Sequence, residues 1–74
     1  MPFEINDVVV LQVDLPVEGL DKGAIGVVIA EFSEPNEAYE IEFLDDEGEM
    51  LAQLALLPDQ LAKFKLRFPP DPEP

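Results

Sequence analysis

The densest group of chemically competent side chains is the acidic run Asp45-Asp46-Glu47, which is followed by Gly48 and Glu49. Clustered carboxylate oxygens are the ligands that Ca²⁺ and Mg²⁺ prefer. The spacing matches no calcium-binding loop, however, and a hairpin turn with hydrated carboxylates accounts for the run, because Gly48 can adopt the positive φ that closes such a turn. We therefore interpret the segment as a turn and expect neither a metal ion nor another cofactor.

The other residue types exclude the commonest catalytic chemistries. The 74 residues include no histidine and no cysteine, and the single serine is Ser33. Histidine acid–base catalysis and triad-type nucleophilic attack are therefore excluded. A carboxylate pair could serve a glycosidase only in a cleft that raises one pKa, whereas the acidic residues here fall in turns and on solvent-facing positions. The glycines of residues 22–28 lead into a strand and lack the pattern of a phosphate loop. We predict that the chain is not an enzyme.

The charge of the chain restricts its partners. Seventeen acidic residues against four basic residues give a formal net charge of -13. Nucleic acid and anionic membranes are themselves polyanions, so both are disfavoured as partners, and a basic protein is the natural complement. An acidic surface also promotes solubility by itself. The charge alone therefore leaves a binding role and a solubility role open.

Length and composition indicate one small folded domain. The hydrophobic fraction is 47%, and the apolar residues come in bursts, which is typical of a globular chain. Without cysteine, neither a disulfide nor a thiolate metal site can stabilise the fold, so its stability must come from the hydrophobic core. The first residues do not resemble a secretory signal, and no apolar run approaches the ~20 residues of a membrane span. We expect a cytoplasmic protein.

Apolar and β-branched segments separated by turn residues predict five short strands. The clearest is the segment in which Tyr39, Ile41 and Phe43 alternate with Glu40 and Glu42. One face of that strand should be buried and the other should face water. The predicted strands cover residues 7–14, 23–32, 38–44, 49–57 and 62–68.

The segments between the strands contain clusters of turn residues. Residues 15–22 predict a loop, residues 33–37 and 45–48 predict two hairpin turns, and Pro58 begins a helical turn over residues 58–61. Gly26, inside a strand, indicates a bulge or a close approach of another backbone.

These elements predict an all-β fold, a small five-stranded SH3-like barrel with one short 3-10 turn before the last strand. The alternative is an open α+β arrangement in which residues 49–57 form a helix. The barrel domain should span residues 1–68, and the proline-rich acidic residues 69–74 should form a flexible tail.

Two charged features remain as candidate binding surfaces. Acidic side chains concentrate in the two hairpins, where an outward face could steer a basic partner. The partner-binding residues that we predict are Glu31, Glu34, Glu37, Glu40, Glu42, Asp45, Asp46 and Glu47. Opposite in sign, Lys63, Lys65 and Arg67 share one face of the last predicted strand. Ion pairs with neighbouring acidic strands explain this basic stripe without a ligand.

Four segments of the sequence resemble a family of short bacterial proteins of unknown function. They are DVVVL at residues 7–11, the loop and strand of residues 14–28, AYEIEF at residues 38–43, and the LLPDQL segment at residues 56–61. The family's pattern is in turn similar to the SH3-like barrels of KOW modules, which usually bind nucleic acid or ribosomal and transcription proteins. The basic and aromatic surface of those modules is replaced here by glutamates. The resemblance also implies an antitoxin or immunity role.

Three hypotheses follow. The first is a non-enzymatic acidic module that binds a basic protein, as an antitoxin or immunity protein would. The second is a structural subunit or assembly factor that docks on a larger enzyme through an edge of the barrel. The third is a KOW-like module that contacts nucleic acid through Lys63, Lys65 and Arg67.

Overall fold

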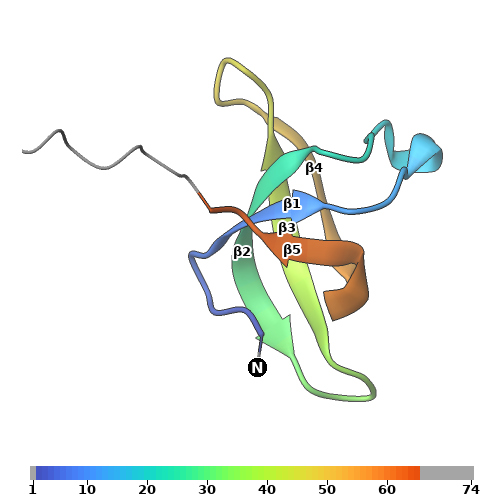
Figure 1. Ribbon diagram of the computed structural model, residues 1–74, viewed down its shortest axis with the longest axis vertical. Helices are drawn as coiled ribbons and strands as arrows, with labels where there is room; N and C mark the ends of the chain where they lie inside the picture. Colours follow the sequence, from blue (N-terminus) through green and yellow to red (C-terminus); the bar gives the residue numbers. More distant parts are fainter. Residues whose placement is uncertain (1, 66–74) are drawn as a thin grey trace, which may run out of the picture.

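The computed structural model describes residues 2–65, which fold into one antiparallel sheet with the strand order β4-β3-β2-β1-β5 (Figure 1). The chain also forms two 3-10 turns, η1 at Pro16–Glu18 and η2 at Pro58–Gln60. The strands are β1 Val8–Leu11, β2 Ile25–Phe32, β3 Ala38–Leu44, β4 Met50–Leu56 and β5 Leu61–Lys63. The predicted all-β fold, with five strands and a 3-10 turn before the last one, is confirmed. Residues 50–56 form a strand and not a helix.

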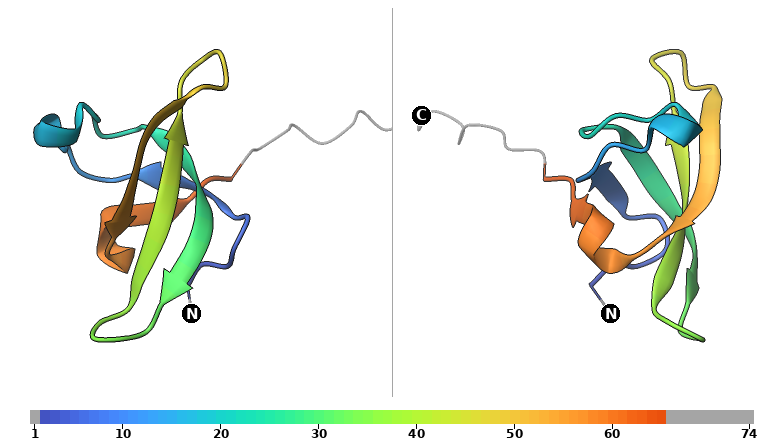
Figure 2. Two further views of the ribbon diagram at one scale, coloured as in Figure 1. Left: turned by 180° about the vertical axis from the view of Figure 1, so that it is seen from behind. Right: turned by 90° about the vertical axis from the view of Figure 1, so that its right-hand side faces the viewer.

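The sheet is strongly curved, so that β1 and β5 run across the direction of β3 and β4 (Figures 1 and 2). Within the described residues no hydrogen-bonded pairing joins β4 to β5, and these two strands are therefore the edges of the sheet. The concave side encloses the core. The buried apolar side chains are Phe3, Val9, Leu11, Leu20, Val28, Tyr39, Ile41, Phe43, Leu56 and Leu61.

Alternation in β3 places the core on one side of the sheet. Tyr39, Ile41 and Phe43 are all fully buried, while Glu40 and Glu42 point to the opposite side. This arrangement agrees with the period of two that the sequence shows. The prediction for β3 is confirmed in both its bounds and its buried face.

Gly26 lies where two strands come unusually close. A Cβ placed on Gly26 would lie 2.6 Å from Cγ2 of Ile41 and 2.9 Å from the carbonyl oxygen of Glu42. The predicted close approach of another backbone is therefore confirmed at this glycine. The bulge of β2 lies further along, where the pairing with β3 shifts between Val28 and Ala30.

Residues before the first strand complete the core. The ring of Phe3 packs edge-on against Tyr39, with centroids 5.2 Å apart and planes at 83°. Asn6 adopts a positive φ of 80°, and its amide donates to the carbonyl of Val28 at 2.8 Å. This turn carries Phe3 back over the core, a role that the sequence patterns do not predict.

The first and last strands are shorter than predicted. The first ends at Leu11 because the chain then enters the long loop, in which Asp14 Oδ1 accepts a 2.8 Å hydrogen bond from the amide of Lys22. The last spans Leu61–Lys63, and the Phe64 amide adds one more bond to the carbonyl of Val8. Residues 66–68 of that predicted strand, and the predicted tail at residues 69–74, lie outside the described residues.

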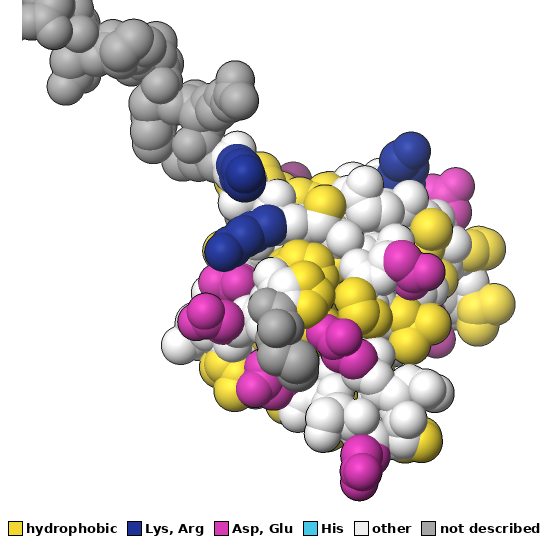
Figure 3. Space-filling view, turned by 60° about the horizontal axis from the view of Figure 1, so that its bottom comes forward, with side chains coloured by type: hydrophobic (Ala, Val, Ile, Leu, Met, Phe, Trp, Pro, Cys, Tyr) yellow, Lys and Arg dark blue, Asp and Glu magenta, His cyan; other side chains and the backbone are white. Residues whose placement is uncertain are grey.

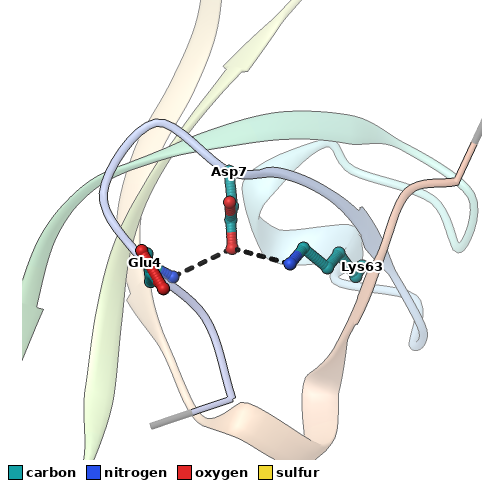
Figure 4. A network of polar contacts seen from close by, with 3 residues as sticks. All are labelled: Glu4, Asp7 and Lys63. Carbon is teal, nitrogen blue, oxygen red and sulfur yellow. Dashed lines mark hydrogen bonds and ion pairs between the residues drawn. The ribbon is translucent and has the colours of Figure 1, made fainter.

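Asp7 ties the two ends of the described chain together (Figure 4). Its Oδ2 accepts a hydrogen bond of 2.9 Å from the amide of Glu4 and lies 3.6 Å from Nζ of Lys63. Asp7 thus orders the turn before β1 and contacts the end of β5.

Candidate functional site

The convex side of the sheet, which we call the outer face, carries the residues that alternate with the core positions. Strand register aligns them in rows. One row runs from Val8 through Val27 and Glu42 to Gln53. The outer face comprises Val8, Val10, Ile25, Val27, Ala30, Phe32, Ala38, Glu40, Glu42, Leu44, Met50, Leu51, Gln53, Ala55 and Ala62.

Much of the outer face is apolar and reaches solvent. Its large exposed side chains are Val8, Ile25, Phe32, Leu44, Met50 and Leu51. Scattered single apolar residues on a surface need no explanation, whereas apolar residues gathered on one face make that face a candidate interaction surface. The sequence patterns did not single out this surface, because the density of apolar residues in β1 and β2 conceals which of them face outward.

A shallow open depression of ≈ 370 Å³ lies at one end of the outer face, where β2, β3 and β4 meet. Ile25, Leu44 and Leu51 contribute its apolar walls, and Asp45 and Asp46 contribute carboxylates. An apolar wall beside a carboxylate suits a lysine or arginine side chain, whose stem is aliphatic and whose head is cationic. The depression could therefore receive such a side chain from another protein.

The two aspartates of this depression differ in role. Asp45 Oδ1 accepts hydrogen bonds from the amides of Glu47, at 2.8 Å, and Glu49, at 2.9 Å. Gly48 has a φ of 82° in the same turn, as predicted. Asp45 is thus a turn residue, whereas the exposed Asp46 presents its carboxylate to solvent. The acidic run is explained by hairpin geometry, as the sequence indicated.

Glu40 and Glu42 lie in the middle of the outer face on β3. Both are half-buried, and Glu40 Oε2 accepts a hydrogen bond of 3.1 Å from Gln53 Nε2. Within residues 2–65 the one ion pair joins Lys63 to Asp7, so no described cation neutralises either glutamate. The apolar surface therefore surrounds two uncompensated negative charges.

Two other predicted site residues face the opposite side of the sheet. Glu31 pairs directly with Tyr39 and therefore lies on the core side of the sheet. Glu37 Oε2 accepts a 2.6 Å hydrogen bond from the phenol of Tyr39. Burial of this phenol, followed by its hydrogen bond to Glu37, raises the pKa of Tyr39 to about 12.

The last two predicted residues, Glu34 and Glu47, lie in the two hairpin turns, which are at opposite ends of the molecule (Figure 1). Acidic side chains also appear as separate spots between apolar and uncharged surface in Figure 3. The structure thus brings together Glu40 and Glu42 with Asp45 and Asp46 around the outer face, and it does not join all eight predicted residues into one surface.

The basic stripe is only partly described. Lys63 pairs with Asp7 at 3.6 Å, which agrees with the ion-pair interpretation. Lys65 is exposed and follows the end of β5, while Arg67 lies outside the described residues.

Residues 2–65 contain no cluster of three acidic side chains arranged to hold a metal ion. In the same part of the chain, no helix is long and apolar enough to cross a membrane.

Comparison with known proteins places the chain in a family. No curated protein and no solved structure matches it. A family model, described as a domain of unknown function (DUF4926), matches residues 5–63. This match covers most of the chain, including all five strands. The chain therefore belongs to the DUF4926 family.

Proposed function

We propose that this chain is a non-enzymatic protein-binding module that docks a basic protein on its outer face. The observation that carries the proposal is the depression in which Ile25, Leu44 and Leu51 meet the carboxylates of Asp45 and Asp46. Apolar anchors at the centre of an interface supply most of the affinity. Carboxylates around them set the association rate and select a cationic partner.

The charge distribution supports a basic partner over other classes. Glu40 and Glu42 lie within the apolar surface, and the chain carries a net charge of -13. A neutral or acidic partner would bury these carboxylates without compensation, which is costly. A lysine-rich or arginine-rich partner would pair with them instead. An antitoxin or immunity protein that occludes a basic protein is the specific form of this function that we propose.

The first experiment captures binding partners from a lysate of the source cells. It compares the wild type with a variant that lacks apolar anchors of the outer face. Ile25→Ser with Leu51→Ser removes apolar anchors from the outer face. Val17→Ser is the control, because Val17 is 95% exposed on η1 and does not line the depression. A basic protein should be retained by the wild type and by the control and lost from the double variant.

The second experiment measures association kinetics with the captured protein. Glu40→Gln with Glu42→Gln should lower the association rate about tenfold at low salt and less at high salt, because screening weakens the attraction. Glu4→Gln with Glu18→Gln removes the same charge at exposed positions that do not line the depression and should have a smaller effect. Equal binding by all variants, or capture of no basic protein by the wild type, would overturn the proposal.

A further inference from the structure

The edge strand β4 offers a second interaction surface, which differs from the outer face in using the free backbone groups of the strand. It pairs with β3 on one side only. A strand edge presents unpaired backbone N–H and C=O groups, which natural proteins usually protect with charges, prolines or very short strands. The seven residues Met50–Leu56 contain no charged residue and no proline. Their pairing with β3 is regular from Ala52 to Leu56, after a shift at Leu44.

The opposite edge of the sheet, strand β5, is protected against pairing with another strand. Strand β5 has only three residues, and it ends in Lys63, which is exposed. A short strand with a lysine at its end is a poor template for another strand. The two edges therefore differ, and β4 is the less protected one.

We propose that two copies of this chain associate by antiparallel pairing of β4 with β4 about a two-fold axis at Gln53. In this register Leu51 of one copy lies opposite Ala55 of the other, and Ala52 lies opposite Leu54. In these two pairs a large side chain faces a small one, so they interdigitate without clashing, while Met50 lies opposite Leu56 at the two ends of the paired segment. The two Gln53 side chains meet at the axis, where each amide can both donate and accept a hydrogen bond.

Charge opposes this register only weakly, although both copies are acidic. Glu40 and Glu42 are on β3, one strand behind the edge, whereas Glu49 precedes Met50 and would lie opposite Leu57 at the end of the paired segment. Across the joined edges, the β3 strands of the two copies would be three strand spacings apart, or about 14 Å, which exceeds the screening length of about 8 Å at physiological ionic strength. The contact itself is uncharged. The remaining repulsion comes from Glu49 and from the net negative charge of each copy, and because salt screens it, added salt should strengthen the dimer.

Association through β4 would extend the sheet from one copy into the next and place two outer faces side by side. A partner with two basic sites could then bind both faces, which raises the effective affinity without any new contact. The two-fold arrangement is closed, so it produces dimers and not fibres.

The test is sedimentation velocity and equilibrium of the full chain over a wide concentration range, at about 0.1 M and 1 M NaCl. The apparent mass of the wild type should rise with concentration from the 8.2 kDa of one chain to twice that mass. In high salt this rise should occur at a lower protein concentration. Gln53→Lys places like charges opposite each other at the axis and should remain monomeric throughout. Val17→Lys is the control, because it makes the same charge change on an exposed loop and should still dimerise.

Amide hydrogen exchange identifies the contact. Exchange within Met50–Leu56 should slow as the concentration rises, whereas exchange within Leu61–Lys63 should not change. A wild type that stays monomeric in high salt into the millimolar range would overturn the proposal. So would a dimer that leaves β4 exchange unchanged or forms equally in Gln53→Lys. The salt response separates this dimer from the proposed basic partner, whose binding should weaken as salt is added.

Discussion

The phenol of Tyr39 donates a hydrogen bond of 2.6 Å to Glu37 Oε2 from a fully buried ring. Its pKa rises from 10.0 to about 12, chiefly because burial disfavours the phenolate. A group whose pKa is raised on folding contributes stability that is complete below the unfolded pKa. Tyr39 should therefore stabilise the fold below pH 10 and progressively lose this contribution between pH 10 and about 12.

This titration can be followed directly, because Tyr39 is the only tyrosine of the chain. Tyrosinate absorbance should show a midpoint near 12 in the folded protein and near 10 in denaturant. The free energy of unfolding of Tyr39→Phe should be flatter than that of the wild type over the same pH range. A folded midpoint near 10 would contradict the buried, hydrogen-bonded phenol.

Gly26→Ala should destabilise the fold by about 1–3 kcal/mol, the usual cost of overpacking. The added methyl group would meet Cγ2 of Ile41 at 2.6 Å and the Glu42 carbonyl oxygen at 2.9 Å, and a backbone atom cannot move away easily. Chemical denaturation measures the loss. Gly48→Asn serves as the comparison and should change stability little, because that turn position has a φ of 82°, which asparagine tolerates, and a Cβ added there would meet no atom within 4 Å.

Asp7 should stabilise the fold more through its hydrogen bond to the Glu4 amide than through its ion pair with Lys63. Lys63 is 54% exposed at the side chain, so Lys63→Met should cost less than about 1 kcal/mol. Asp7→Ala also removes the acceptor of the Glu4 amide and should cost about 1–2 kcal/mol. Asp7→Asn retains an acceptor oxygen and should fall between the two in thermal unfolding. Equal losses for Lys63→Met and Asp7→Ala would show that the ion pair dominates.

The sequence predicted those strands whose two faces differ in polarity. The alternation of Tyr39, Ile41 and Phe43 with glutamates identified β3 to the residue, and the hairpin turns on either side followed from turn chemistry. Phe3 was not identified, because a single aromatic residue ahead of the strands has no periodic context. The last strand was overestimated because alternation continues to Phe68, whereas its neighbour β1 begins at Val8 and offers Lys65 no partner.

The candidate site could be predicted only in part, because strand register decides on which side of the sheet a residue lies. With uninterrupted pairing between β2 and β3, Glu31 would lie opposite Ala38 and on the outer face. The shift between Val28 and Ala30 moves Glu31 opposite Tyr39 instead. One extra residue in a strand reverses the side of everything after it. No local pattern in the sequence placed that bulge.

The pairing of β1 with β5 also has a consequence for how the protein is made. Val9 pairs with Lys63, and Leu11 pairs with Leu61. During translation, the first strand therefore emerges from the ribosome well before its outer partner. The sheet cannot be completed until the segment through Lys63 has left the exit tunnel. Contacts of such long sequence separation are slow to form, so the domain should acquire its native structure only after its last strand has emerged.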